Sequence, residues 1–225
     1  MRWLLKVWNV VLDVFFPPLC LGCQQYLEDH EKPNLLCERC FVNIDIYHIP
    51  FRISPDFMLA AAGSYENKAL RALIHYFKYE NFLAADKPLG EIMIKHLELA
   101  RIVPPNALVI PVPLHRKRLR ERGFNQSELI GAGIARHFSL TLRTDLLERI
   151  RNTAPQMEIE DYDKRRKNVR KSFEVPAERA SILIGGTVLL VDDVYTSGAT
   201  MQEAARTLRR AGANRVIGVV IAKAG

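Results

Sequence analysis

The segment that most constrains the fold is 187–201, which reads Thr-Val-Leu-Leu-Val-Asp-Asp-Val-Tyr-Thr-Ser-Gly-Ala-Thr-Met. Its apolar run 188–191 shows no alternation with polar residues, which is typical of a strand covered on both faces of a parallel sheet. Two adjacent carboxylates, Asp192 and Asp193, follow directly, and a helix is expected from about 199 to 211. The sequence therefore predicts an α/β fold with acidic side chains beyond the carboxyl end of a buried strand, where open α/β sheets bind ligands.

The residues between the carboxylates and this helix form a short loop suited to a phosphate group. Side chains alternate along an extended backbone, so Asp192 and Asp193 should diverge and accept hydrogen bonds from different hydroxyls of a diol. Gly198 permits unusual dihedrals, and free N–H groups at a helix start favour an anion. We therefore predict a phosphorylated polyol as ligand, with ribose 5-phosphate the simplest. The loop residues expected at its phosphate are Thr196, Ser197, Gly198, Ala199 and Thr200.

Two other interpretations of this segment compete with a ribose site. One is a strand followed by a polar helix cap that binds no ligand, and it stays open as an alternative. The other is the acidic strand of a nucleoside triphosphatase. That class requires a G-x-x-x-x-G-K-[ST] loop upstream, and the sequence contains none.

The length and charge of the chain set broad limits. With 225 residues it can bury a full α/β core and carry a small additional module. The formal net charge of +7 favours anionic partners, either phosphorylated ligands or nucleic acid, without choosing between them.

Residues 1–19 are predicted to form a short amphipathic helix, because apolar side chains recur at helical spacing from Trp3 to Val14. Lys6 and Asp13 interrupt the stretch, which is too short and too polar to span a membrane. Peripheral membrane contact is an alternative role for this helix. No small-residue cleavage site follows it, so we predict a cytoplasmic protein.

All four cysteines lie within residues 20–40, in two C-x-x-C pairs. A C-x-x-C turn places two thiolates on one metal ion, and two such turns complete a tetrahedral site. Two disulfides would require an oxidising compartment, which nothing else in the sequence indicates. A redox site would need only one pair. We therefore predict a closed structural zinc site held by Cys20, Cys23, Cys37 and Cys40.

The chain between the cysteines and the acidic segment is predicted to contain a linker and then alternating strands and helices. Residues 41–57 are predicted to be a linker, because they contain Pro50 and Pro55 and little periodicity. The main domain is predicted to span 58–225. Its further strands are expected at 58–65, 107–112 and 215–221, and its further helices at 68–79, 88–100 and from 123–127 to about 138.

A dense basic run follows the strand predicted at 107–112, directly after Pro113 and Leu114. Five cationic side chains within seven residues at a strand end would meet a dense anion such as pyrophosphate or a nucleic-acid backbone. A solvated charged face is the alternative. The candidate anion-binding residues of this run are Arg116, Lys117, Arg120 and Arg122.

A second basic stretch covers 149–173 and has few apolar residues. A long polar loop beside a core is often a lid or a binding loop, and this one would close over an anionic ligand. A solvated loop is the alternative. Its candidate contacts to an anion or to nucleic acid are Arg165 and Arg166.

The segment 192–200 closely resembles the phosphoribosyl-pyrophosphate (PRPP) loop of type I phosphoribosyltransferases. In that family two acidic residues hold the ribose hydroxyls and the loop wraps the 5-phosphate, so the resemblance gives Asp192 and Asp193 the first role and 196–200 the second. It implies a type I phosphoribosyltransferase fold, with a central, mainly parallel sheet flanked by helices. The four-cysteine zinc module would precede that domain.

The order of features along the chain resembles the ComF family, which includes GntX-like and amidophosphoribosyltransferase-like competence proteins. The features are the paired C-x-x-C module, the Pro-Val-Pro-Leu segment at 111–114 with its basic run, the motif Arg151-Asn152-Thr153 with Arg166-x-Asn168-Val169, and the acidic loop. The resemblance spans nearly the whole chain. It implies a part in natural transformation, in handling imported single-stranded DNA with other DNA-uptake proteins.

Two functions are expected from the sequence. The first is a phosphoribosyltransferase-like protein that binds PRPP or ribose 5-phosphate and acts in natural transformation. The alternative is an active Mg²⁺- and PRPP-dependent phosphoribosyltransferase of nucleotide metabolism, in which Pro113 and Leu114 would lie near the pyrophosphate and Mg²⁺ would stabilise the leaving anion. The sequence does not decide whether the protein is catalytically active.

Overall fold

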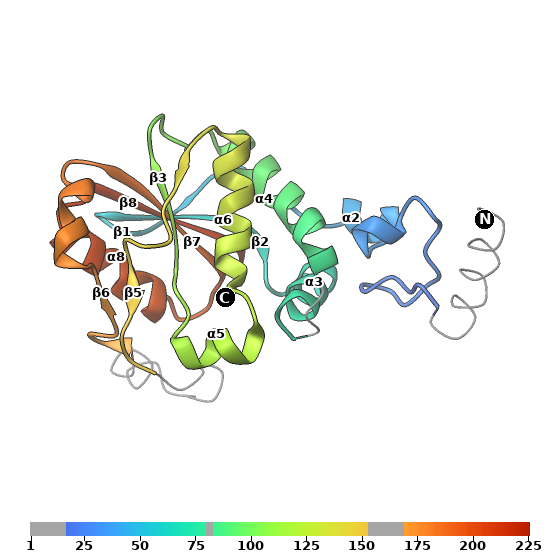
Figure 1. Ribbon diagram of the computed structural model, residues 1–225. Helices are drawn as coiled ribbons and strands as arrows, with labels where there is room; N and C mark the ends of the chain where they lie inside the picture. The colour runs from blue at the N-terminus through green and yellow to red at the C-terminus, as the bar shows by residue number, and fades with distance from the viewer. Residues whose placement is uncertain (1–16, 80–82, 153–168) are drawn as a thin grey trace.

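A central sheet dominates the computed structural model, which describes residues 17–79, 83–152 and 169–225 (Figure 1). Its six strands are ordered β1-β2-β8-β7-β3-β4. All neighbouring pairs run parallel except the first, in which β1 is antiparallel to β2. The strands are β1 (Phe51–Ser54), β2 (Phe57–Ser64), β3 (Leu108–Pro111), β4 (Thr141–Leu142), β7 (Thr187–Tyr195) and β8 (Arg215–Lys223). The predicted mainly parallel α/β sheet is therefore confirmed.

Helices cover both faces of this sheet (Figure 1). One face packs against α3 (Lys68–Tyr79), α4 (Asp86–Ala100) and α6 (Gln126–His137). The other packs against α8 (Ala199–Arg210), the 3₁₀ helix η4 (Ala177–Leu183) and β6 (Phe173–Glu174), which pairs with β5 (Glu148–Arg149). The strand β7 lies between the two cores.

The residues of β7 show why its apolar run has no alternation. Leu189 and Val191 belong to the core beneath α4 and α6, whereas Val188 and Leu190 belong to the core beneath α8. All four side chains are fully buried. A strand covered on both faces needs apolar residues at every position, as the sequence predicted.

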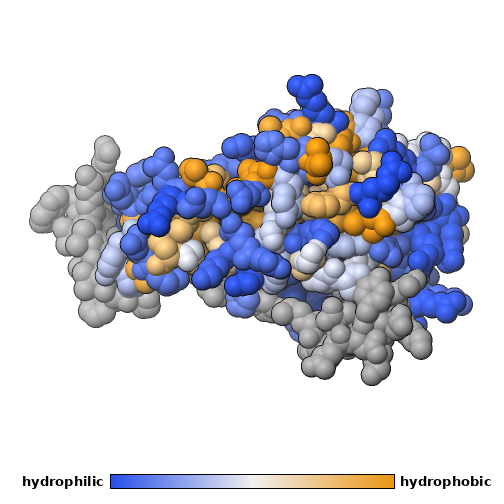
Figure 2. Space-filling view, turned by 180° about the vertical axis from the view of Figure 1, so that it is seen from behind, coloured by the Kyte–Doolittle hydropathy of each residue, from blue (hydrophilic) through white to orange (hydrophobic). Residues whose placement is uncertain are grey.

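The cysteine-containing segment forms a small lobe beside α3 (Figure 1). It contains the 3₁₀ helix η1 (Lys32–Asn34) and the short helix α2 (Glu38–Val42). Its buried residues Cys20, Leu27 and Leu36 belong to the same apolar cluster as the residues of α3 and α4. Seen from behind, the lobe is a narrower part of the molecule than the main domain (Figure 2). The lobe therefore packs on the main domain through apolar side chains.

The segment 41–57, predicted as a linker, contributes β1 to the sheet. Pro50 precedes that strand, and Pro55 lies in the turn that joins β1 to β2. Prolines are tolerated at strand ends because no ladder hydrogen bond is lost there. These two prolines mark the ends of a short edge strand, which the sequence pattern did not reveal.

Two other expectations changed. The basic run after β3 forms a helix, α5 (Arg116–Arg122), which begins with His115 as its cap and ends at Gly123 in a left-handed conformation, φ 77°. The strand β7 continues to Tyr195, so the two carboxylates lie inside the strand and not beyond it. The N-terminal helix predicted for 1–19 lies almost wholly outside the described residues, as do Arg165 and Arg166.

Candidate functional site

The two carboxylates lie where β7 has lost one of its neighbours. Pairing between β3 and β7 ends at Val191, whereas pairing between β8 and β7 continues to Tyr195. From Asp192 onward, one edge of β7 is no longer paired with β3. This staggered end exposes the carboxylates to a cavity while the strand still fixes their backbone.

The side chains of the pair contact different helices. The Ser127 hydroxyl, at the start of α6, donates to Asp192 Oδ1 at 2.9 Å, and the backbone N–H of Asp193 donates to the same oxygen at 2.9 Å. Asp193 Oδ1 lies 3.0 Å from Lys78 Nζ, near the end of α3. The pair therefore reaches toward separate partners, in line with the divergence expected for neighbours in a strand.

The electrostatics of the pair distinguish its members. Burial and then the charge of Asp193 raise the pKa of Asp192 to about 7, although the Ser127 hydrogen bond acts in the opposite direction. Burial lowers the pKa of Lys78, but the nearby Asp193 and Asp192 outweigh it and hold the pKa above its ordinary value. Lys78 is therefore an ammonium ion at neutral pH, while Asp192 gains and loses its proton near neutrality.

The loop after the carboxylates has a shape that only glycine permits at one position. Gly198, the cap of α8, has φ 73°, and a Cβ built there would collide with the ring of Tyr195. The Tyr195 hydroxyl accepts a hydrogen bond from Gln202 Nε2 at 3.0 Å, on the first turns of α8. The buried ring thus fixes how the loop meets the helix.

A cavity of about 280 Å³ lies at this end of the sheet. It brings together most residues that the sequence assigned to a phosphorylated ribose. Ser197 and Ala199 belong to the same turn but do not line the cavity. The assigned residues that do line it are Pro113, Leu114, Asp192, Asp193, Thr196, Gly198 and Thr200.

The cationic residues of α5 are divided between two sides of the helix. Arg122 lines the cavity together with Arg118, one helical turn earlier, as expected for residues at positions i and i+4. Arg116, Lys117 and Arg120 are exposed and do not line it. The basic run therefore contributes one face to the cavity and another to solvent.

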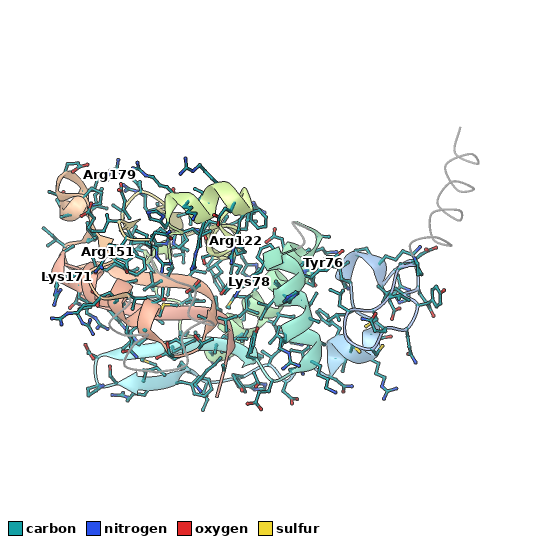
Figure 3. The ribbon with its side chains drawn as sticks, turned by 90° about the horizontal axis from the view of Figure 1, so that it is seen from below. Tyr76, Lys78, Arg122, Arg151, Lys171 and Arg179 are labelled. Atoms are coloured by element: carbon teal, nitrogen blue, oxygen red, sulfur yellow. The ribbon has the colours of Figure 1, made fainter. Side chains whose placement is uncertain are left out.

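Several residues of the cavity were not singled out from the sequence. Figure 3 shows Lys78 and Arg122 close together in the view from below, one from α3 and one from α5, and both line the cavity. Arg118 belongs to the basic run expected at an anion, although its place on the inner side of a helix was not predicted. No local signal marks the others, because their contacts depend on the tertiary fold. The polar residues of the cavity not predicted include Tyr65, Lys78 and Arg149, with Ser127 behind Asp192.

Arg149 adds a further cation to the cavity from β5. Burial, together with the charge of Arg118, lowers the pKa of Arg149 to about 10, and Asp192 acts in the opposite direction. The guanidinium remains charged at neutral pH. It also lies over the ring of Phe173, 5.4 Å from the ring centroid, which packs it against the neighbouring strand β6.

The carboxylate pair does not by itself make a site for Mg²⁺. This ion takes octahedral oxygen ligands and is usually held by carboxylates together with phosphates of the substrate. Among the residues that the structure describes, only the four cysteines form a group of three or more metal-binding side chains. One oxygen of Asp193 already pairs with Lys78. A Mg²⁺ ion would therefore need the oxygens of a ligand to complete its coordination.

The four cysteine sulfurs gather in one cluster, all within 4.8 Å of one another. Zn–S bonds of about 2.3 Å in a tetrahedron place sulfurs about 3.8 Å apart, and Cys23 Sγ and Cys37 Sγ are 3.7 Å apart. None of the four is in a disulfide. Cys37 N–H donates to Cys20 Sγ at 3.3 Å, and backbone donors such as this outweigh burial and lower the pKa of Cys20 to about 7. The donor set fits a metal ion held by thiolates.

Within the described ranges, no helix combines the length and apolar character that a membrane span needs.

Comparisons with known proteins agree with this geometry. Residues 117–225 match the phosphoribosyl transferase domain. Competence protein F of Haemophilus influenzae is 27% identical over 206 residues, covering 88% of this chain and 87% of that protein. DNA utilization protein YhgH of Escherichia coli O157:H7 is 29% identical, over 88% and 90% of the two chains. Competence protein ComFC of Bacillus subtilis is 32% identical over 108 residues, 47% of this chain and 39% of that one.

The parallel sheet, the acidic strand end and the matched domain together define a phosphoribosyltransferase-like protein with a four-cysteine cluster near its N-terminus. Its homologues include competence protein F and ComFC. Over most of its length the chain is similar to proteins of competence and DNA utilization, and these similarities support a place in the ComF family.

Proposed function

We propose that this protein binds PRPP or ribose 5-phosphate in the cavity at the end of β7, and that it acts in handling imported single-stranded DNA. One observation carries the first part: the carboxylate pair, the loop at the start of α8 and the inner face of α5 line the same cavity. These groups complement, respectively, a diol, a monophosphate and a further anion.

The ligand orientation follows from the positions of these groups. Asp192 and Asp193 accept hydrogen bonds from the ribose hydroxyls. The loop 196–200 and the N-terminus of α8 receive the 5-phosphate, where free N–H groups and the helix dipole favour an anion. In PRPP, the pyrophosphate points toward Arg118 and Arg122, and Mg²⁺ accompanies the ligand through its phosphate oxygens.

The proposed DNA contact uses the outer face of α5. Arg116, Lys117 and Arg120 are exposed there, and cations presented in this way bind backbone phosphates without reading sequence. The names of the relatives, competence protein F and DNA utilization protein, support a role with DNA. We include Arg165 and Arg166, which lie outside the described residues, among the proposed DNA contacts. We also propose that the protein acts in the cytoplasm with other DNA-uptake proteins as partners.

The cysteine cluster completes the proposal as a structural zinc site. Four thiolates leave no open coordination position, so the ion would stabilise the lobe without taking part in chemistry.

Calorimetry on matched variants tests the two binding parts separately. PRPP, ribose 5-phosphate and a short single-stranded DNA are titrated, with Mg²⁺ present, into wild type and three double variants. The first, Asp192→Asn with Asp193→Asn, removes the diol acceptors. The other two reverse charge on one helix only, at its inner face (Arg118→Glu, Arg122→Glu) or at its outer face (Arg116→Glu, Arg120→Glu).

The carboxylate and inner-face variants are expected to lose at least about tenfold in affinity for the ribose ligands, because hydrogen bonds to charged groups are worth about 1.5–3 kcal/mol each. Both should retain DNA binding. The outer-face variant should show the reverse, with weaker DNA binding and a shallower dependence on salt. Wild type that binds neither ribose ligand would reject the ribose part, and DNA binding that is absent or insensitive to salt would reject the DNA part.

A further inference from the structure

Lys78 is a partly buried cation at the carboxylate pair, and the proposed ligand contacts give it no role. Its Nζ lies 3.0 Å from Asp193 Oδ1, with the two side chains 19% and 15% exposed. It comes from the last turn of α3, whose neighbouring Phe77 is fully buried and packs against Phe124, 5.8 Å between ring centroids. The end of α3 is therefore held firmly, and the ammonium group is held with it.

This ion pair has its main effect on the charge of the cavity. A buried ion pair adds little net stability, since the loss of hydration offsets most of the attraction. At Asp193, however, it compensates one negative charge at the place where the ribose hydroxyls are proposed to bind. Asp192 contributes less than a full negative charge at neutral pH, because its pKa is about 7.

The rest of the cavity adds positive charge. Arg118, Arg122 and Arg149 line it with Lys78, so four cationic side chains face two carboxylates. Sites built from carboxylates alone repel a phosphorylated ligand, and a divalent cation is then needed between the two. Among the described residues that line the cavity, the cations therefore outnumber the carboxylates before any metal ion is bound.

We propose that Lys78 supplies, at the carboxylate pair, the positive charge that a divalent cation brings elsewhere, so that the cavity binds ribose 5-phosphate as the metal-free anion. The inference rests on the proposed ribose site and specifies the form of its ligand. Mg²⁺ then accompanies ligands with a pyrophosphate group but is not required for the sugar phosphate.

The test is calorimetry of ribose 5-phosphate in Mg²⁺-free buffer, cleared of divalent ions before the protein is added so that the cysteine cluster keeps its metal, and in millimolar Mg²⁺, with wild type, Lys78→Met and Lys68→Met. Lys68 lies at the exposed start of the same helix and makes the matched control, because its replacement changes the net charge equally. Wild type and Lys68→Met should bind with affinities that differ by less than about threefold between the two solutions. Lys78→Met should bind about tenfold more weakly in the Mg²⁺-free buffer, ~1.4 kcal/mol, and recover in Mg²⁺.

Three results would overturn the inference, and one of them would also overturn the site on which it rests. Wild type that binds ribose 5-phosphate only with Mg²⁺ overturns the inference. This result does not depend on whether either variant folds. A Lys78→Met protein that equals wild type in both solutions overturns it too. Wild type that binds ribose 5-phosphate in neither solution overturns the proposed ribose site itself, and the inference with it.

Discussion

Asp192 lies where burial and the charge of Asp193 both oppose its ionisation. Its pKa in the folded protein, about 7, exceeds the ordinary value of 3.8, so the folded state holds the proton more tightly than the unfolded chain does. The stabilisation from this group is complete below about pH 4 and is lost as the pH rises through 7. Above pH 7 the carboxylate therefore lowers the stability of the protein.

Replacing Asp192 with Asn should accordingly stabilise the protein at pH 8 and change little at pH 4. The Asn oxygen still accepts from Ser127, so the gain is the removed charge, roughly 1–3 kcal/mol or several degrees in Tm. Thermal unfolding at the two pH values measures it, and Asp29→Asn at an exposed site is the control. A Tm change that is the same at both pH values would contradict the argument. A variant that is more stable but binds ligand less well would also fit the trade-off between stability and function expected at binding sites.

The sequence predicted Asp192 and Asp193 but not Lys78, and the difference is physical. The carboxylates are marked locally, by an apolar run that must be a buried strand and by the loop that follows it. Lys78 lies on a helix whose apolar positions predict only that the helix packs. Its partner is brought to it by the way α3 crosses the end of β7, which no local pattern encodes.

At the scale of elements, the junction of β7 with α8 depends on a single glycine. Gly198→Ala should cost about 1–3 kcal/mol, because it places a Cβ against the Tyr195 ring at a positive φ. Gly133→Ala is the matched control, since the same change there meets no atom within 4 Å and lies within α6, where alanine is favoured. Chemical denaturation should show a loss for the first variant and none for the second. Equal stabilities would mean that the ring moves aside freely.

The helix α5 shows what composition alone conceals. Its charges were predicted but its helical form was not, because it contains a single apolar residue, Leu119, which is 41% exposed. Periodicity detects helices by their apolar face, and a helix lying over a polar cavity has none. Only the structure therefore shows that Arg118 and Arg122 face the cavity while Arg116 and Arg120 face solvent. The strand β1 was missed for a related reason, since four residues between two prolines carry too little pattern.

At the scale of the whole molecule, α3 connects the two sites. Near its start, Ala69 packs so closely against Gly22 in the first cysteine turn that no side chain fits between them. A Cβ placed on Gly22 would lie 3.2 Å from the Ala69 Cβ and 3.0 Å from Cys40 Sγ. At its end, Lys78 pairs with Asp193. A helix of 12 residues spans about 18 Å. The cysteine lobe thus supports the helix that presents Lys78 to the carboxylate pair.

Removing the metal ion should therefore weaken both the lobe and the distant cavity. Treatment with a strong chelator is expected to release about one zinc per chain. Loss of the zinc should also lower the Tm by several degrees. It should reduce the affinity for ribose 5-phosphate as well, because the start of α3 loses the packing of the cysteine lobe. Cys23→Ser, at an exposed ligand position, should reproduce these effects in part, whereas Glu38→Gln, at an exposed position between Cys37 and Cys40, should not. Metal analysis, thermal unfolding and calorimetry on the same samples decide the matter. A lower Tm with unchanged affinity would confine the metal to the lobe, and an unchanged Tm after complete release would show that the cluster is not structural.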